Sequence, residues 1–266
     1  MAWKSHSTSG NYLFKPTGSR RLMIQGIYTA SRGMTPLMQQ QDQIANNLAN
    51  IHTTGFKQSS LFIKSYNKFM ENDQIQPFAS SDIKADEVFV DYREGPMKMT
   101  KEPFDMMIKG SGFFTIMTAD GVQYTRNGNF SLDPDGLLVT ADGSKVMGKD
   151  GYIRVDKELP VFITENGEVM QNNEPRGELK IADFEKPYSF RRMGESRFLP
   201  LLPDDSPHES GGYSIRQGYL EGSNVDMIRN MVQMITSYRT FEADQKALQA
   251  QDETLDKSVN QVGRVG

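Results

Sequence analysis

The stretch MIRNMVQMITSYRTFEADQKALQAQDETLDKSVNQV, residues 227–262, places apolar side chains at alternating spacings of three and four residues. Gln245 and Asp252 interrupt this row. A spacing that averages 3.5 residues over five heptads is typical of a coiled coil, although one such helix can also pack on its own domain's core. Ser223, followed by Asp226, predicts a capping box that starts the helix. The apolar members of the row are Met227, Met231, Met234, Tyr238, Phe241, Leu248, Leu255, Val259 and Val262.

A second helical pattern lies near the other end of the chain. Its members are Ile27, Ala30, Met34, Leu37, Ile44, Leu48 and Ile51. Pro36 predicts either a kink or a first-turn position capped by Thr35, and we interpret it as a break near Met34. Gly55 predicts the stop of this segment. Two such helices at opposite ends of one chain favour pairing with each other, or with other copies.

The middle of the chain has the pattern of short strands joined by tight turns. Segments such as Phe113–Met117, Leu137–Thr140 and Val161–Thr164 are rich in β-branched and aromatic residues. An Asx-Gly dipeptide between such segments is a strong hairpin signal. The dipeptides begin at Asp120, Asn127, Asp135, Asp142, Asp150 and Asn166.

The predicted fold class is therefore α+β, with paired terminal coiled-coil helices and a mainly antiparallel β domain of small sheets and hairpins. The predicted parts are the terminal helices (23–56 and 223–266), an extended connector (57–95) and the β-rich domain (96–222). Within that domain, residues 186–212 hold four prolines and are interpreted as a long loop. Residues 1–22 form a leader or extension that we expect to be disordered.

Composition argues against several classes of function. The net charge is -4 with acids and bases interspersed, so neither nucleic-acid binding nor attachment to an anionic membrane is expected. No apolar stretch of about 20 residues exists, so no membrane insertion is predicted. The chain has no cysteine, and its three histidines lie in unrelated segments. Asp133–Gly136 begins like a calcium loop, but Ser144 stands where a bidentate glutamate is needed. We expect no metal, no cofactor and no catalytic residues.

Six segments resemble the flagellar rod and hook protein family. They are MIQGIYTA (23–30), IANNLAN (44–50), TGFK (54–57), IKGSGFF (108–114), YTRNGNF (124–130) and QGYLEGSNV (217–225). They occur in the family's order and are spread over the chain from Met23 to Val225. The resemblance implies an inner tube domain of paired terminal helices, a middle connector and an outer β domain.

The resemblance also implies a function and a location. It predicts a structural subunit of the flagellar basal-body rod that polymerises as part of the axial shaft between motor and hook. Its expected partners are copies of itself, other rod subunits, adjacent hook proteins and the type III export apparatus, with ring proteins or peptidoglycan as further contacts. The resemblance further implies export without a cleaved signal peptide and assembly in the periplasm. This would explain why residues 1–22 contain no continuous apolar segment.

The length of the chain and the absence of one insertion indicate which kind of rod or hook protein it resembles. From Met23 the chain is too short for a typical hook protein, and it lacks the glutamine- and glycine-rich insertion of distal rod proteins after the first helix. A proximal rod protein is favoured, with a distal rod protein as the alternative. A periplasmic binding module that uses the β domain alone is the alternative from another class, but it leaves both terminal helices unexplained.

The predicted assembly interface combines both helices. Methionines along the helical row suit a surface that meets its neighbours at varying angles, because methionine fills irregular gaps. Asn46, Asn47 and Asn50 either fix the register across helices or are surface residues near a helix end. The predicted interface residues are Ile44, Asn46, Asn47, Leu48, Asn50, Ile51, Met227, Met231, Met234, Tyr238, Phe241, Leu248, Leu255 and Val259.

Overall fold

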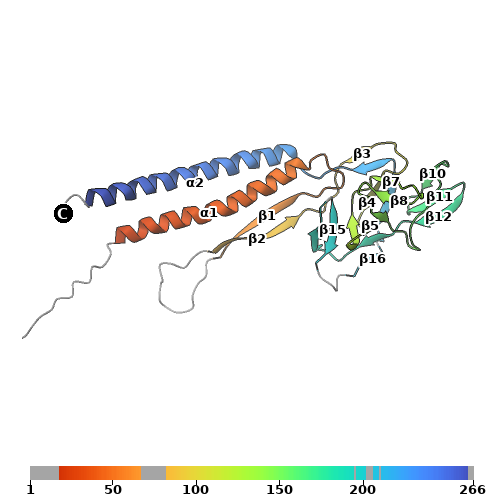
Figure 1. Ribbon diagram of the computed structural model, residues 1–266, viewed down its shortest axis with the longest axis horizontal. Coiled ribbons are helices and arrows are strands. Elements are labelled where there is room, and N and C mark those ends of the chain that lie inside the picture. Colours follow the sequence, from red (N-terminus) through yellow and green to blue (C-terminus); the bar gives the residue numbers. More distant parts are fainter. Residues whose placement is uncertain (1–17, 67–81, 195, 202–205, 210, 263–266) are drawn as a thin grey trace, which may run out of the picture. The chain divides into compact units, whose positions relative to one another are not determined.

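The computed structural model describes residues 18–66, 82–194, 196–201, 206–209 and 211–262 (Figure 1). The chain divides into two compact units. Unit 1 comprises Met1–Gln41, Ile63–Ala85 and Ile235–Gly266, and unit 2 comprises Asp42–Phe62 and Asp86–Met234. Two helices and mainly antiparallel small sheets confirm the predicted α+β class. The pairing of the terminal helices as a coiled coil stays a prediction.

The two helices are long and lie near the ends of the sequence. Helix α1 spans Gly18–Ala49, and helix α2 spans Met227–Val262. The predicted break near Met34 is wrong, because α1 continues through Pro36. A proline removes one backbone hydrogen bond, and the bonds on either side can maintain a helix of 32 residues. Residues 18–22, assigned to the leader from the sequence, are the first residues of α1, and residues 1–17 lie outside the described residues.

The connector contains a β-ribbon. Strand β1 (Ser59–Tyr66) and strand β2 (Asp82–Val90) form a two-stranded sheet. Residues 67–81 of the predicted connector, between these two strands, lie outside the described residues.

The largest sheet of unit 2 has nine strands. Seven of them follow the order β14-β15-β6-β5-β9-β8-β7, and β13 joins β5 to β16. The bounds are β5 Phe113–Thr118, β6 Gly121–Thr125, β7 Phe130–Leu132, β8 Leu138–Thr140, β9 Lys145–Val146, β13 Ile181–Asp183, β14 Phe190–Arg192, β15 Arg197–Pro200 and β16 His208–Glu209.

Three smaller sheets complete unit 2. Strands β10 (Val161–Ile163), β11 (Glu168–Gln171) and β12 (Glu174–Glu178) form one antiparallel sheet. Strand β17 (Tyr213–Gln217) pairs with β4 (Met106–Gly110), so Ile215 lies opposite Ile108. Strand β18 (Tyr219–Glu221) pairs with β3 (Met97–Met99). The last strands of the chain therefore pair with the first strands of the β-rich domain.

Four of the six predicted Asx-Gly turns connect paired strands. Asp120-Gly121, Asp135-Gly136, Asp142-Gly143 and Asn166-Gly167 stand between antiparallel neighbours. The hairpin predicted at Asn127-Gly128 is wrong, because β6 and β7 are not neighbours in the sheet. Asp150-Gly151 lies in a turn that is closed by an isolated bridge between Met147 and Tyr152. At Gly136 the backbone has φ +77°, a conformation that glycine adopts without steric cost.

Residues 186–212 are not one long loop, and that prediction is wrong. They contain β14, β15 and β16. Strand β15 pairs with β6, which places Phe198 opposite Tyr124. Phe198 is 1% exposed and belongs to an aromatic cluster with Phe113, Tyr124, Phe184 and Phe190. Burial of these rings outweighs the local preference of the prolines for irregular structure.

A separate aliphatic core fills the rest of unit 2. It includes Met106, Ile108, Ile116, Leu179 and Ile215, all at most 1% exposed. Among the described residues, no helix has the length and apolar character needed to cross a membrane.

Candidate assembly site

The end of α1 is fixed to the start of β1 by one asparagine. Asn47 is 2% exposed, and its side-chain oxygen accepts a hydrogen bond from the Ser59 backbone N–H at 3.0 Å. Its amide nitrogen donates to the Ser59 carbonyl at 2.7 Å. The amide therefore satisfies both backbone groups of Ser59, as a neighbouring strand would do. The same nitrogen lies 3.4 Å from Oδ1 of Asn230 in α2, so it links both helix ends within unit 2.

Helix α2 begins at an aspartate cap. Asp226 Oδ1 accepts a hydrogen bond from the Arg229 backbone N–H at 3.0 Å, and the buried Asn230 amide donates to the Asp226 carbonyl at 2.7 Å. The predicted cap at Ser223 is wrong, because the Ser223 hydroxyl instead accepts from the Val225 N–H. An aspartate is favoured at this position because its oxygen satisfies an N–H that has no partner inside the helix.

Three buried charges lie between the helix ends and the β sheets. Lys57 and Glu221 form an ion pair in which neither side chain is exposed, and Arg126 lies 3.4 Å from the second Glu221 oxygen. Arg126 also donates to the carbonyls of Ile108 and Gly110. We call Lys57, Arg126 and Glu221 the ion cluster.

The ion cluster is satisfied by further hydrogen bonds. The Lys57 ammonium donates to the Arg93 carbonyl at 2.7 Å, and the Gly95 N–H donates to Glu221 Oε1 at 3.0 Å. Burial lowers the pKa of Lys57, although the Glu221 carboxylate opposes this effect. A buried ion pair contributes little net stability, but removal of one partner leaves an uncompensated charge. The cluster therefore specifies how the three segments meet.

Sequence reasoning did not select the ion cluster as a site. Lys57, Arg126 and Glu221 each stand in a different one of the segments that resemble the family: TGFK, YTRNGNF and QGYLEGSNV. A charged residue beside glycines and aromatic residues in each segment was the available signal. Which charges pair could not be read from local spacing, since Lys57 and Glu221 are 164 residues apart.

Another cationic side chain, outside the ion cluster, also connects the β domain to the segment that follows α1. The Arg192 guanidinium lies 4.7 Å from the centre of the Phe56 ring and donates to the Ser59 hydroxyl at 3.4 Å. Burial lowers the pKa of Arg192. This contact was not predicted, because residues 186–212 were interpreted as a loop.

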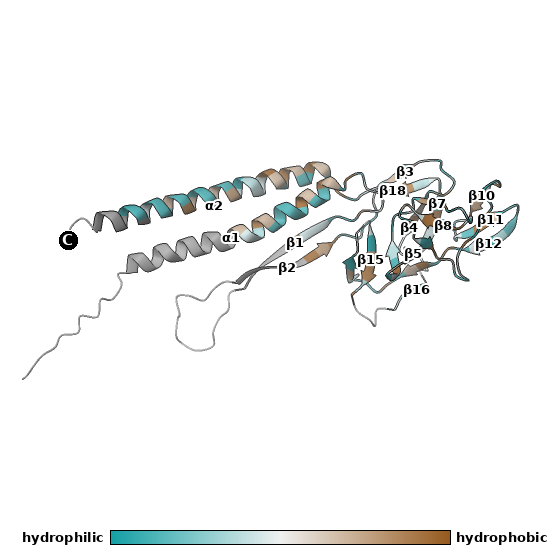
Figure 2. Cartoon of the chain, in the orientation of Figure 1, coloured by the Kyte–Doolittle hydropathy of each residue, from teal (hydrophilic) through white to brown (hydrophobic). Residues whose placement is uncertain are grey.

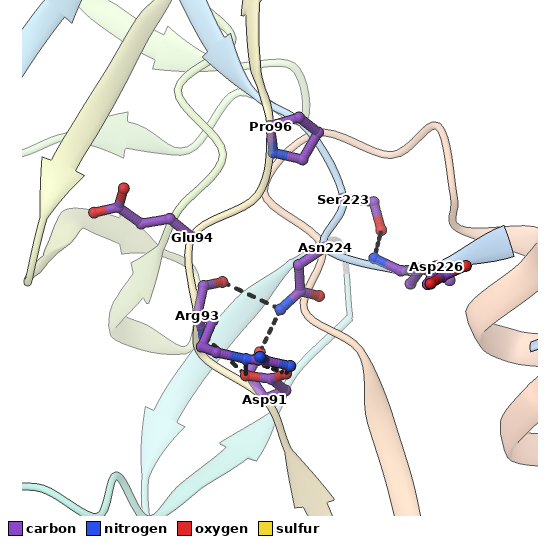
Figure 3. Close-up of a pocket in the computed structure, with 8 residues that line it drawn as sticks. Asp91, Arg93, Glu94, Pro96, Ser223, Asn224 and Asp226 are labelled. Carbon is purple, nitrogen blue, oxygen red and sulfur yellow. Dashed lines mark hydrogen bonds and ion pairs between the residues drawn. The ribbon is translucent and has the colours of Figure 1, made fainter. Parts of the chain in front are cut away.

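A polar hollow of about 400 Å³ lies beside the start of α2 (Figure 3). Its walls come from the segment after β2 and the segment before α2, and Asn224 joins the two walls. The Asn224 amide donates to the carbonyls of Asp91 and Arg93, and its oxygen accepts from the Gln58 N–H. The lining residues are Asp91, Arg93, Glu94, Pro96, Ser223, Asn224, Val225 and Asp226.

The acids of this hollow already have partners. Hydrogen bonds from the Arg93 guanidinium lower the pKa of Asp91, Glu94 accepts from the Gly110 N–H, and Asp226 caps α2. The pKa of Asp91 is therefore lowered, whereas a general acid needs a raised pKa. Among the described residues, no group of histidines and acids could hold a metal ion.

The predicted interface residues of α1 differ in exposure. Ile44 and Asn47 are buried, whereas Asn46 is exposed. Leu48, Asn50 and Ile51 are half-buried. The three asparagines are thus not equivalent, and Asn47 alone among them is fully buried within the chain.

The predicted residues of α2 fall on two faces. Met234, Phe241 and Leu248 are half-buried, whereas Met227, Met231 and Tyr238 are exposed. The side chains of Leu255 and Val259 lie outside those that the structure describes. The exposed apolar residues form what we call the α2 stripe: Met227, Ile228, Met231, Val232, Ile235 and Tyr238, with exposed fractions from 40% to 76%. Figure 2 shows this apolar character at the start of α2, where brown gives way to mostly teal further along the helix.

The less exposed row of α2 is more polar than the stripe. It consists of Asn230, Met234, Ser237, Phe241, Asp244, Leu248 and Gln251. These positions also alternate at spacings of three and four residues. The helix therefore has two rows with the coiled-coil period, and its more apolar row is the one that a single chain leaves in water.

Three family models match this chain. The model described as flagella basal body rod protein matches residues 27–57. The flagellar hook protein FlgE/F/G D1 domain matches residues 107–171, and the flagellar basal body rod FlgEFG protein C-terminal matches residues 216–262. The matched segments include the ends of both helices and most of the nine-stranded sheet.

Whole proteins match as well. The flagellar basal-body rod protein FlgG of Borreliella burgdorferi is 30% identical over 256 residues, which cover 88% of this chain and 97% of the relative. FlgF of Caulobacter vibrioides is 31% identical over 245 residues, which cover 89% of this chain and 95% of the relative. FlgG of Bacillus subtilis is 28% identical over 261 residues, which cover 90% of this chain and 99% of the relative.

Proposed function

The chain belongs to the flagellar basal-body rod protein family, and we propose that it is a proximal rod subunit that polymerises through its terminal helices. Family membership makes it a structural subunit of the rod in the flagellar basal body. The family is not one of enzymes. Such a subunit assembles with other rod and hook subunits, and the proposal adds which surface does so.

The α2 stripe is the observation that carries this proposal. A single chain exposes six large apolar side chains on one helix, and Ile228 alone is 76% exposed. Full burial of one such side chain contributes about 1.5–3 kcal/mol. Contiguous exposed apolar surface marks an interaction site in a soluble protein. Burial of the stripe against neighbouring subunits would therefore stabilise the polymer and leave the monomer soluble.

The segment after α1 supports a proximal position. Residues 57–95 contain three glutamines and one glycine, so they carry no glutamine- and glycine-rich run. The resemblance assigns such a run to distal rod proteins. We propose further that the chain is exported by the flagellar type III apparatus and assembles in the periplasm, where ring proteins or peptidoglycan are additional contacts.

The test is a pair of polar substitutions in the stripe. Ile228→Asp with Val232→Asp is expected to abolish swimming in the source bacterium, and cryo-tomography is expected to show no rod beyond the point where this subunit is added. Acidic residues are tolerated in the first turns of a helix, so circular dichroism of the purified variant should match that of the parent chain. Normal flagella in this variant would overturn the role of the stripe.

The matched control is Gln233→Asp. Gln233 is exposed and lies about 100° around the helix axis from Val232, away from the stripe. This variant is expected to swim normally.

A second experiment tests the position of the subunit in the rod. A tag is inserted at Gly211 and located in a tomographic average of basal bodies. Density near the inner membrane supports a proximal subunit, and density at the hook end supports a distal one.

A further inference from the structure

The methionines of the chain fall into a buried set and an exposed set. The chain has 16 methionines and no cysteine, so methionine thioethers are its only sulfur groups. Met106 and Met107 are 0% and 3% exposed, and Met106 belongs to the aliphatic core. An oxidant that reacts with thioether sulfur therefore meets the exposed set first. Among the methionines whose side chains the structure describes, the exposed ones are Met38, Met97, Met99, Met227 and Met231.

Two of these exposed methionines are neighbours in the α2 stripe. Met227 and Met231 are 40% and 47% exposed. They are four residues apart in one helix, a spacing that places both side chains on the same face. The other stripe residues of these turns, Ile228 and Val232, are aliphatic and carry no hydrogen-bond donor in their side chains. The two sulfur atoms therefore belong to an apolar surface that water reaches in the single chain.

We propose that Met227 and Met231 are a site of oxidative modification by peroxides, and that their oxidation blocks the polymer contact of the α2 stripe. The inference rests on the proposed function, because it concerns the regulation of the same surface. The thioether sulfur attacks one oxygen of hydrogen peroxide, so a sulfur–oxygen bond forms and the peroxide O–O bond breaks. The sulfur is oxidised by two electrons to the sulfoxide, and the departing hydroxide takes the proton of the transferred oxygen and leaves as water.

A sulfoxide is unfavourable inside an apolar contact between subunits. Oxidation converts the apolar thioether into a polar group whose oxygen accepts hydrogen bonds. A buried acceptor without a donor costs free energy, and Ile228 and Val232 supply no donor from their side chains. In the single chain the same oxygen is hydrated, so α2 and the core of unit 2 keep their structure. Oxidation therefore acts on assembly and leaves the fold of the subunit intact.

The site is open to peroxide only before the subunit assembles. Neighbouring subunits that bury the α2 stripe exclude peroxide from Met227 and Met231. Met106 is shielded in both states, because the core of its own unit covers it. Met97 and Met99 lie on β3, outside the stripe, and are 58% and 57% exposed in the single chain. These two methionines show how fast peroxide reacts with an exposed thioether of this fold.

Peptide mass spectrometry measures the accessibility of the site. The purified full-length chain and isolated basal bodies are treated with the same concentration of hydrogen peroxide, and the addition of oxygen to each methionine is followed over time. In the free chain, Met227 and Met231 are expected to react about as fast as Met97. They should react at least about tenfold faster than Met106, which must wait for the core to open. In basal bodies, the reaction at Met227 and Met231 is expected to slow at least as strongly.

Glutamine substitutions test the consequence, because glutamine resembles methionine sulfoxide in size and polarity and is a good helix former. Met227→Gln with Met231→Gln is expected to abolish rod assembly and swimming. Leucine at the same two positions should preserve both, as should Met97→Gln with Met99→Gln outside the stripe.

Two outcomes would overturn the inference. One is normal swimming of the Met227→Gln, Met231→Gln strain, and the other is oxidation of both methionines in the free chain no faster than that of Met106. Polymerisation through the stripe would stand in either case, because Ile228→Asp with Val232→Asp tests it separately.

Discussion

The ammonium of Lys57 donates a hydrogen bond to the carboxylate of Glu221, and neither side chain has exposed surface. Lys57 directly precedes the connector ribbon, and Glu221 ends β18, close before α2. One ion pair thus joins the chain as it leaves α1 to the chain as it approaches α2.

Glu221→Gln is expected to destabilise unit 2 by about 3–5 kcal/mol, because Lys57 and Arg126 would remain buried without an anion. Urea unfolding of the purified chain, followed by circular dichroism, measures this loss. Arg93→Ala removes an ion pair whose arginine is 84% exposed, so solvent screening should make its cost much smaller. Equal losses in the two variants would contradict the role assigned to the ion cluster.

Asn47→Ala is expected to cost about 2–4 kcal/mol, since it leaves the buried N–H and carbonyl of Ser59 without partners. The neighbouring Asn46→Ala is the control. Asn46 is exposed, so its replacement should change the free energy of unfolding by at most about 0.5 kcal/mol. The same unfolding assay compares them, and similar values for both asparagines would show that the Asn47 amide is dispensable.

Gly128→Ala is expected to destabilise unit 2 by at least about 1–3 kcal/mol. A Cβ at Gly128 would lie 1.7 Å from the Met106 carbonyl oxygen, and this approach accompanies the hydrogen bond from the Met106 N–H to the Gly128 carbonyl. A Cβ at Gly211 would meet nothing within 4 Å, so Gly211→Ala serves as the control. Thermal unfolding of both variants checks the difference, and a Gly128→Ala protein as stable as the control would refute the close approach.

Stability is expected to depend on Asp142 at acid pH. Burial raises the pKa of this carboxyl, but hydrogen bonds from Thr140 and Ser144 and the charge of Arg197 outweigh it and keep the pKa below the ordinary value of 3.8. The folded state therefore binds its proton at lower pH than the unfolded state does. The stabilisation is present above pH 3.8 and is lost as the pH falls through the folded pKa.

The measurement is urea unfolding of the parent chain and of Asp142→Asn over a pH series. At pH 7 the variant should be less stable by at most about 1 kcal/mol, because it loses charged hydrogen bonds at an exposed position where solvent screens the charge. The difference should shrink below pH 3.8. A difference that is constant with pH would show that the carboxylate charge plays no part.

Local signals predicted much of the secondary structure. Four of the six Asx-Gly dipeptides placed hairpins correctly, because the turn conformation depends on the two residues themselves. Asn127-Gly128 did not, since β6 and β7 pair with other strands. The prediction for residues 190–200 was wrong for the opposite reason. Its strands depend on Phe190 and Phe198 packing in a cluster with distant Phe113, and no local pattern reports that contact.

The candidate site was predicted only in part. A period of 3.5 identified α2, but two rows of the helix share that period, and hydrophobicity alone selects the more apolar one. The row that a single chain shields includes Asn230 and Ser237. Likewise, the sequence pattern does not distinguish Asn46, Asn47 and Asn50 from one another. The contact with Ser59 that distinguishes Asn47 depends on the fold.

The pairing of β17 with β4 determines when the β-rich unit can complete its fold. Ile215 and Ile108 belong to one core, so the β-rich unit cannot close until the chain is present as far as its final strands. Contacts between segments so far apart in sequence also form slowly, because the intervening chain must first lose entropy. If the proposed export delivers the N-terminus first, the β-rich unit would complete its core only after β17 has left the export channel.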